Sequence, residues 1–400
     1  MKLPLLLCSV TDCKNLIKYY NFLMIDIKKA KRIVFKFGTN VLRGDDGSIS
    51  LSRIYSFIED ISKLHKKGKE VLVVTSGAVG LGAGKVHVDP SADIVTKQAC
   101  AAIGQTSLMS IYEHGFDKFN ITCAQVLLTE EDLSQRVKYL SLSNVLDKLL
   151  ELRIIPIINQ NDTVNTAELE EIHGIFEVCF SDNDKLSALV SSRLGADLLV
   201  ILSDIDALYD DNPKENPNAK RIAVVDEVTP EIEKMGQSAS KGGRGGMKTK
   251  LEAAKVVTRS GGHVIIANGK TPGIIRKIFT EEDLGTIFNP TEQLTGRKRW
   301  IGYATNITGK IKINDGAKKA LLEKEASLLS IGVLDVLGEF KRGEVVTILD
   351  EKGNEFAKGM VNYGSNDCRK IMGQHSEKIL ELLGYKNYDA IITRDNIVIL

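Results

Sequence analysis

Short apolar runs alternate with amphipathic segments through most of the first two-thirds of the chain. The apolar runs lie at residues 33–37, 71–74, 124–128, 154–158, 198–202 and 264–267. Segments with apolar side chains at helical spacing lie between them, at residues 51–64, 93–117, 140–152 and 186–194. This alternation predicts an α/β fold with a mainly parallel sheet and helices on both of its faces.

Small and polar residues follow four of the apolar runs, at residues 38–40, 75–77, 159–162 and 203–204. The carboxyl ends of parallel strands meet at one edge of a sheet, and ligands of such folds bind there. The sequence therefore predicts one ligand site built from these four polar breaks.

A lysine, Lys36, lies inside the first apolar run, just before Gly38. An unpaired ammonium group is costly to bury, so a buried Lys36 needs an anionic partner. At the end of a parallel strand that partner is expected to be a phosphate. The alternative is a surface lysine on an edge strand.

Three other segments carry candidate chemistry. The glycine-rich segment 242–250 opens a helix that is predicted to run to about residue 259, and glycines at a helix start suit phosphate binding, although a surface loop has the same composition. The segment 181–185 (SDNDK) suits a helix N-cap, a magnesium complex or the amine of a substrate. The segment 269–271 (GKT) resembles a Walker A loop, but Val264 stands where that loop needs its first glycine, which excludes it.

From Arg297 onward the segments are shorter and alternate, as at 309–313, 331–333 and 345–349. They predict a small, mostly β domain. The polar stretch 289–299 reads as a linker. Residues 1–23 read as a leader or as a mis-assigned start, since Met24 lies shortly before the first strand.

Composition excludes several classes of protein. The chain has 400 residues, 26% of them charged, and a net charge of +1, which does not favour nucleic acid or membrane surfaces as partners. Its six cysteines form no CxxC pair, which argues against a disulfide framework or a zinc site and fits a reducing, cytoplasmic compartment.

Several motifs occur in an order that resembles the glutamate 5-kinases of the amino-acid kinase family. They are FKFGTN at 35–40, TSGA at 75–78, NQNDT at 159–163, SDND at 181–184 and GGMKTK at 245–250. The segment from 298 (KRWI) resembles the appended PUA domain of that family. The resemblance covers about residues 31–385 and implies a catalytic domain at 24–288, a linker at 289–299, a PUA-like domain at 300–385 and a tail at 386–400.

The resemblance implies the transfer of a phosphoryl group from ATP, with Mg²⁺, to the side-chain carboxylate of L-glutamate, the first step of proline synthesis. It implies Lys36, Lys250 and Asp184 as catalytic residues, and Ser76, Asp162 and Asn183 as glutamate ligands. The ATP-binding residues that it implies are Lys36, Ser203, Asp204, Arg244, Gly245, Gly246, Met247, Lys248, Thr249 and Lys250. No protein site for a resident metal is expected.

The sequence departs from the family pattern at two positions, Gln160, where the family usually has Glu, and Arg244, where it usually has Thr. Expected partners are L-glutamate, proline as a feedback inhibitor, a glutamyl-phosphate reductase and further copies of the chain. RNA and membranes are not expected partners. The alternatives are a kinase of the same fold acting on aspartate, acetylglutamate, carbamate or UMP, and an RNA-binding PUA protein.

Overall fold

The computed structural model describes residues 27–44, 47–129, 132–133, 135–164, 183–213, 215–238, 246–280, 284–291, 298, 301–302, 307, 309–324 and 326–400. The chain divides into two compact units, residues 1–132 with 140–293 and residues 133–139 with 294–400. The proposed leader at 1–23 lies outside the described residues, and the predicted domain boundaries stay predictions.

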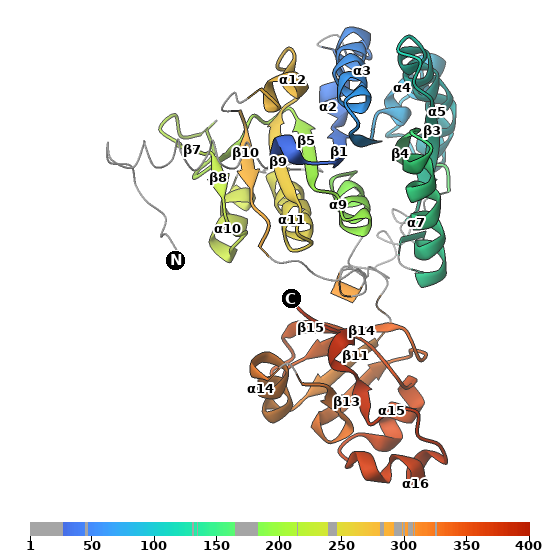
Figure 1. Cartoon of the computed structure of the whole chain (residues 1–400), viewed down its shortest axis with the longest axis vertical. Coiled ribbons are helices and arrows are strands. Elements are labelled where there is room, and N and C mark those ends of the chain that lie inside the picture. Colours follow the sequence, from blue (N-terminus) through green and yellow to red (C-terminus); the bar gives the residue numbers. More distant parts are fainter. Residues whose placement is uncertain are drawn as a thin grey trace. The chain divides into compact units, whose positions relative to one another are not determined.

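The first unit is built on an eight-stranded sheet with the strand order β3-β4-β2-β1-β5-β9-β10-β8 (Figure 1). Its strands are β1 (Arg32–Phe37), β2 (Glu70–Val74), β3 (Cys123–Leu128), β4 (Ile155–Gln160), β5 (Leu198–Ser203), β8 (Val224–Val225), β9 (His263–Asn268) and β10 (Thr286–Phe288). All neighbouring pairs are parallel except β9 with β10. The prediction of a mainly parallel sheet is confirmed.

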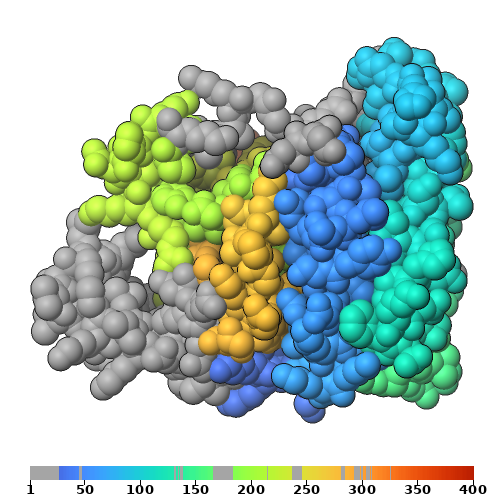
Figure 2. All heavy atoms as spheres, turned by 90° about the horizontal axis from the view of Figure 1, so that it is seen from above, coloured from blue at the N-terminus to red at the C-terminus, as the bar shows by residue number. Residues whose placement is uncertain are grey.

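Helices cover both faces of this sheet. One face carries α3 (Leu51–Lys66), α4 (Ala78–Val86), α5 (Ile94–Asp117) and α12 (Ile274–Ile278), and Figure 2 shows this face, with gold α12, blue α3 and cyan to teal α4 and α5 side by side. The other face carries α9 (Asn183–Leu194), α10 (Pro230–Ser238) and α11 (Met247–Thr258). The unit also contains α2 (Thr39–Leu42), most of α7 (Arg136–Glu151) and the hairpin of β6 (Leu208–Tyr209) and β7 (Arg221–Ile222).

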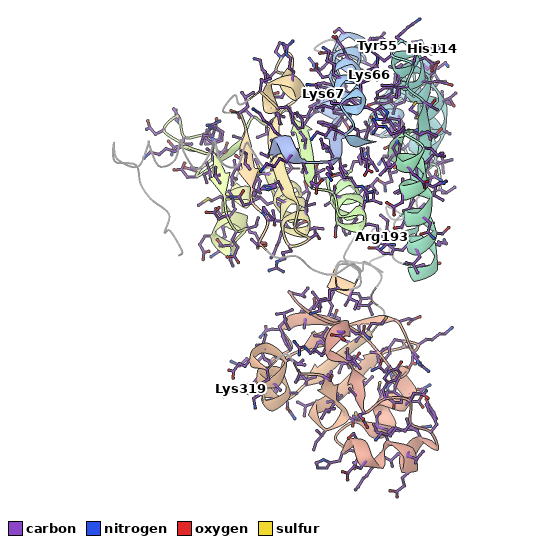
Figure 3. All side chains as sticks on the ribbon, in the orientation of Figure 1. Tyr55, Lys66, Lys67, His114, Arg193 and Lys319 are labelled. Carbon is purple, nitrogen blue, oxygen red and sulfur yellow. The ribbon has the colours of Figure 1, made fainter. Side chains whose placement is uncertain are left out.

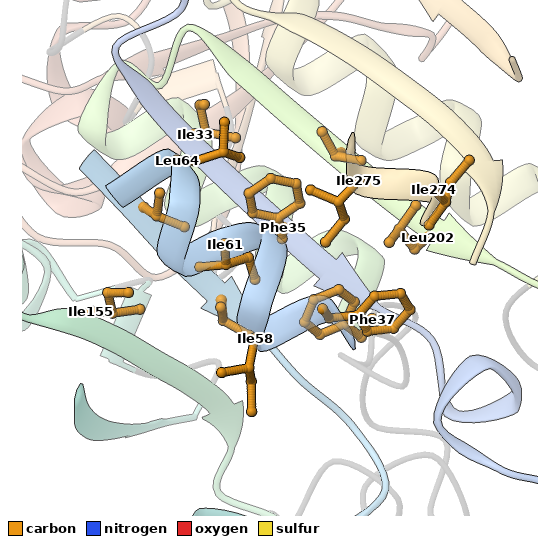
Figure 4. Packing of buried hydrophobic residues seen from close by; sticks show 14 of the residues in the cluster. Ile33, Phe35, Phe37, Ile58, Ile61, Leu64, Ile155, Leu202, Ile274 and Ile275 are labelled. Carbon is orange, nitrogen blue, oxygen red and sulfur yellow. The ribbon is translucent and has the colours of Figure 1, made fainter. Parts of the chain in front are cut away.

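Strand β1 lies at the centre of the sheet, between β2 and β5. Its side chains alternate between the two faces. Ile33, Phe35 and Phe37 belong to the core that packs under α3, and Phe37 stacks on Phe57 of α3 with ring centroids 4.7 Å apart (Figure 4). Lys36 therefore points to the opposite face, where α9 and α11 lie.

Helix α3 shows why an amphipathic segment forms a covering helix. Ile58 and Ile61 are fully buried against the sheet (Figure 4). Tyr55 is 43% exposed, and Lys66 at the end of the helix is also exposed, on the outer side of the unit (Figure 3). The apolar stripe therefore indicates which side of α3 meets β1.

Helices α4 and α5 approach each other so closely that only glycine fits at the contact. A Cβ atom added to Gly82 would lie 1.8 Å from the carbonyl oxygen of Cys100, and one added to Gly104 would lie 1.8 Å from that of Ala78. Gly77, just before α4, has φ of +99°, which favours glycine. The loop between β2 and α4 is thus held by main-chain packing.

The second unit has a five-stranded sheet with the order β13-β11-β14-β15-β17 and a separate pair of β12 with β16. Its strands are β11 (Gly309–Ile313), β12 (Leu328–Leu329), β13 (Val333–Gly338), β14 (Val345–Leu349), β15 (Glu355–Met360), β16 (Ala390–Ile392) and β17 (Ile397–Ile399). Its helices are α14 (Asp315–Glu323), α15 (Ser365–Ile371) and α16 (Ile379–Leu383). The predicted strand at 331–333 is wrong in part, because Ser330–Gly332 form a 3₁₀ turn that leads into β13.

Candidate active site

Four of the parallel strands end at one edge of the first sheet, and the predicted polar breaks follow them. The end of β1 is tied to the end of β5, because the Gly38 amide donates to the carbonyl of Leu202 at 3.0 Å. The end of β2 is tied to β4, because the Thr75 amide donates to the carbonyl of Ile158 at 2.9 Å. The breaks at 38–40, 75–77, 159–162 and 203–204 are thus gathered at one place, as predicted.

Lys36, Asp184 and Lys250 form a buried ionic cluster on the α9 side of this edge. Lys36 Nζ lies 2.7 Å from Asp184 Oδ1, and Lys250 Nζ lies 3.1 Å from Asp184 Oδ2. The side chain of Asp184 is 0% exposed, and those of the two lysines are 5% and 4% exposed. Three distant segments, β1, α9 and α11, supply the three groups. The edge-strand interpretation of Lys36 is therefore wrong.

Burial and the two lysines act in opposite directions on the Asp184 carboxyl. Burial alone would raise its pKa, but the charges and hydrogen bonds of Lys36 and Lys250 outweigh it and lower the pKa from 3.8 to about 2. Asp184 is therefore ionised near neutral pH. Two ammonium groups thus face one carboxylate at this edge of the sheet, an arrangement that suits an anionic ligand.

The start of helix α11 completes the cluster. Thr249 Oγ1 donates to Asp184 Oδ2 at 3.0 Å, and it also lies 3.0 Å from the carbonyl oxygen of Gly246. Met247 is buried at the first helical position. The helix N-terminus has the positive end of the helix dipole, so it favours an anion beside the two lysines.

Asn183 joins the cluster to the loop after β2. Its Nδ2 atom donates to the carbonyl oxygen of Thr75 at 2.8 Å and to Ser76 Oγ at 2.7 Å, and it lies 3.3 Å from Asn159 Oδ1. Ser76 and Asn159 are both buried. The predicted residues Ser76 and Asn183 are therefore in direct contact, although they are far apart in the chain.

The end of β5 carries a second acidic group. Asp204 accepts hydrogen bonds from Asn40 Nδ2 at 2.9 Å and from Ser203 Oγ at 3.1 Å. Burial raises the pKa of Asp204, but the hydrogen bonds from Asn40 and Ser203 and the charge of Lys250 bring it below its usual value. Asp204 thus stays ionised and ties the loop after β1 to β5.

The other predicted residues divide into three groups. Asp162 is half-buried in the turn after β4, at the same edge of the sheet. Lys248 lies away from the ionic cluster, since its side chain is 61% exposed and pairs with Glu252 at 3.9 Å. Arg244 and Gly245 lie outside the described residues.

Sequence reasoning missed some contacts of the site. It assigned Thr249 to ATP alone and gave no role to Asn40 or Asn159. Asn40 and Asn159 stand directly in two polar breaks, so the strand-end signal includes them. The bond of Thr249 to Asp184 has no such signal, because it joins segments that are 65 residues apart.

The described part of the chain has neither a metal-binding cluster nor a membrane-spanning helix. Within the described residues, no three His, Cys, Asp or Glu side chains cluster in a way that could hold a metal ion. Among the described helices, none combines the length and the apolar character that a bilayer crossing requires.

Comparisons with known proteins show which family the chain belongs to. The model of the amino acid kinase family matches residues 31–268, and that of the PUA domain matches residues 309–383. The chain is 43% identical over 376 residues to the glutamate 5-kinase of Syntrophotalea carbinolica, covering 93% of this chain and 98% of the relative. It is 43% identical over 390 residues to that of Methanosarcina barkeri, covering 95% of this chain and 98% of the relative.

The solved structures that this chain matches are more distant in sequence. The carbamate kinase of Giardia lamblia bound to AMP-PNP is 17% identical, with a TM-score of 0.47, and the match covers 66% of this chain and 100% of that one. The isopentenyl phosphate kinase of T. acidophilum in a product complex is 18% identical, with a TM-score of 0.41, and the match covers 64% and 100%. The family models and the relatives with high identity decide the assignment: the chain belongs to the amino acid kinase family, within its glutamate 5-kinase group, and carries a PUA domain after the kinase domain.

Proposed function

We propose that the protein is a glutamate 5-kinase, which transfers the γ-phosphoryl group of ATP to the side-chain carboxylate of L-glutamate. The buried cluster of Lys36, Asp184 and Lys250 is the observation that supports this most strongly. It places two ammonium groups at the edge of the sheet where ligands of parallel folds bind. The relatives that match nearly the full chain carry the name of this activity.

The chemistry needs charge neutralisation rather than a general base. A glutamate carboxylate has an ordinary pKa of about 4.3, so it is already a nucleophile near neutral pH. One carboxylate oxygen forms a bond to the γ-phosphorus, and the bond between that phosphorus and the β–γ bridging oxygen breaks. The bridging oxygen leaves with ADP, and the product is L-glutamyl 5-phosphate. No proton has to move.

We assign Lys36 and Lys250 to the transferring phosphoryl group. Two anions must meet in this reaction, and ammonium groups placed at the developing charge lower that barrier. Asp184 holds both lysines in place, since each of its carboxylate oxygens faces one of them. Thr249 and the start of α11, with Gly246 and Met247, would meet the phosphates of ATP. Ser203 and Asp204 are also assigned to ATP, with no contact to its phosphates specified.

We assign Ser76, Asp162 and Asn183 to glutamate. Hydroxyl, carboxylate and amide groups are the types that recognise the ammonium and carboxylate groups of an amino acid. Ser76 and Asn183 are hydrogen-bonded to each other, and Asp162 lies in the turn after β4 at the same edge of the sheet. The glutamate would thus lie beside the two lysines, with its side chain toward the γ-phosphate.

Mg²⁺ fits this site only as a companion of ATP. Among the described residues there is no cluster of three potential metal ligands, and both oxygens of Asp184 already face lysines. We propose that the ion is held mainly by the phosphates, where Mg²⁺ is usually found in kinases. It would supply further neutralisation of phosphate charge.

The product suggests further partners. An acyl phosphate hydrolyses readily in water, so an enzyme that reduces it to the aldehyde is the expected consumer. We also propose that the chain forms homo-oligomers and that proline inhibits it.

Glutamate-dependent release of ADP, with hydroxylamine trapping of the acyl phosphate as a hydroxamate, tests the proposal. We expect hydroxamate with L-glutamate, and none with aspartate, acetylglutamate, carbamate or UMP as acceptors. Turnover with one of these and none with glutamate would overturn the proposed substrate. RNA binding as tight as the binding of the kinase substrates, measured at two salt concentrations, would favour an RNA-binding role instead.

A further inference from the structure

A chain of buried amide groups extends from the glutamate-binding residues to helix α5. Gln105 Oε1, on α5, accepts a hydrogen bond from Asn159 Nδ2 at 2.9 Å. Asn159 Oδ1 in turn accepts a hydrogen bond from the main-chain N–H of Gln160 at 2.9 Å and lies 3.3 Å from Asn183 Nδ2. Gln105 is 8% exposed and Asn159 is 2% exposed, so water does not compete strongly for these bonds.

Backbone groups fix the direction of every bond in this chain. The Thr75 carbonyl can only accept, so the Asn183 NH₂ group must face it. The Gln160 amide can only donate, so Asn159 Oδ1 must face it, and Asn159 Nδ2 is left to face Gln105. Neither asparagine can turn its amide without breaking a bond to the backbone.

Two polar atoms of this chain have no hydrogen-bond partner among the described residues. They are Asn183 Oδ1, an acceptor, and Gln105 Nε2, a donor, and both are shielded from solvent. Three acceptors surround Asn183 Nδ2, so its oxygen is the atom that remains for a ligand. An ammonium group has only donors and fits that oxygen.

We propose that Gln105 is a positioning residue for glutamate, which holds Asn159 in the orientation that keeps the Asn183 oxygen available to the substrate ammonium group. The inference rests on the proposed function. Without the Gln105 acceptor, Asn159 Nδ2 becomes a buried donor with no partner, which is unfavourable. Asn159 is then held on one side only, by the main-chain N–H of Gln160, so its Oδ1 atom is no longer fixed beside Asn183 Nδ2. One of the three acceptors that orient the Asn183 amide is weakened.

The close contact of α4 with α5 makes this support possible. Gly104 lies against the carbonyl of Ala78, next to the loop that carries Ser76, and Gln105 is its neighbour on α5. Helix α5 therefore reaches both the strand end at Asn159 and the start of α4. Gln105 does not contact the substrate itself; it acts on the substrate through Asn159 and Asn183.

The experiment compares Gln105→Met with the wild type and with Tyr112→Phe in the full chain. Tyr112 lies on the same helix and is also buried, and its hydroxyl contacts the Thr75 hydroxyl at 2.8 Å but none of the three amides. For Gln105→Met we expect the glutamate KM to rise about tenfold or more, a loss of about 1.4 kcal/mol, with the ATP KM changed by less than about threefold. For Tyr112→Phe we expect both KM values within about threefold of the wild type.

A double-mutant cycle with Asn159→Ala tests the route of the effect. If Gln105 acts through Asn159, adding Gln105→Met to Asn159→Ala changes the glutamate KM little further. Additive effects would overturn the proposal, as would equal rises in the KM for ATP and glutamate. If Gln105→Met does not fold, Gln105→Glu, which keeps the acceptor, should bind glutamate at least tenfold more tightly than Gln105→Leu, and equal affinities would overturn it. Wild-type protein without glutamate-dependent ADP release would refute the proposed function instead.

Discussion

Replacing Asp184 by asparagine should destabilise the protein and slow the reaction together. The substitution keeps the shape of the side chain but removes the negative charge between two buried lysines. Breaking a buried ion pair by removing one partner costs about 3–5 kcal/mol, because the remaining charge is left uncompensated. With a urea m-value of about 3 kcal/mol/M, the unfolding midpoint should fall by roughly 1–1.7 M at pH 7.

The difference between Asp184→Asn and the wild type should shrink in acid. Folding lowers the pKa of Asp184 from 3.8 to about 2. The folded state therefore binds the proton less tightly than the unfolded state, so this stabilisation is fully present above pH 3.8 and is lost as the pH falls toward 2. At about 1.36 kcal/mol per pKa unit, roughly 2 kcal/mol of the difference should disappear once the pH is below 2, and about half of that by pH 3.

The assay is urea unfolding at pH 7, 5, 4 and 3, with Glu59→Gln as the control. Glu59 pairs with Lys63 at 2.6 Å, but both side chains are 52% exposed, so the same loss of charge should leave the midpoint nearly unchanged. An Asp184→Asn midpoint equal to that of the control at pH 7 would refute the reasoning. A difference from the wild type that stays constant between pH 5 and 3 would also contradict it.

Four further outcomes are expected. Lys36→Ala and Lys250→Ala should each lower kcat by about 10²–10³ while the ATP KM changes less, and a near-normal kcat for Lys250→Ala would contradict its role. Asp162→Ala should raise the glutamate KM far more than the ATP KM in steady-state kinetics. Equal rises in both KM values would mean that Asp162 supports the fold of the site rather than binding glutamate. Proline should raise the glutamate KM without lowering kcat, because it shares the α-amino-acid head, and Gln160→Glu should alter its potency; inhibition that glutamate does not relieve would argue against a shared site. A fragment of residues 24–289 should fold and keep glutamate phosphorylation, tested by light scattering and kinetics, and a folded but inactive fragment would place the second domain in the active unit.

Most elements with a strong apolar period were predictable from the sequence. The runs at 198–202 and 264–267 are strands β5 and β9 with small changes at their ends. Helix α4 was missed, because its sequence AVGLGAGKV is rich in glycine, which disfavours a helix on its own. Its close packing on α5 overrides that preference, and such a contact is not visible in the local pattern.

The site was predictable as a set of strand ends but not as a network. Because ligands bind where parallel strands end, the sequence predicts that the polar breaks lie together. The family motifs then identify Lys36, Asp184 and Lys250 among the nearby residues. The hydrogen bond from Asn159 to Gln105 joins residues that are 54 positions apart. It depends on how β4 and α5 are placed against each other, and the local sequence of neither segment predicts that placement. Lys248 looked equivalent to Lys250 in the sequence, yet two residues along a helix turn it to the exposed side.

The contact between α4 and α5 also bears on how this protein can change during evolution. Side-chain packing drifts easily, because one apolar residue can replace another of similar size. At Gly82 and Gly104 the neighbours are carbonyl oxygens, which every amino acid has. The position of the loop with Ser76 therefore depends on main-chain contacts, which most substitutions of side chains leave unchanged. Lineages can replace most of the residues around these helices and still place the serine at the same point, provided that the two glycines are kept.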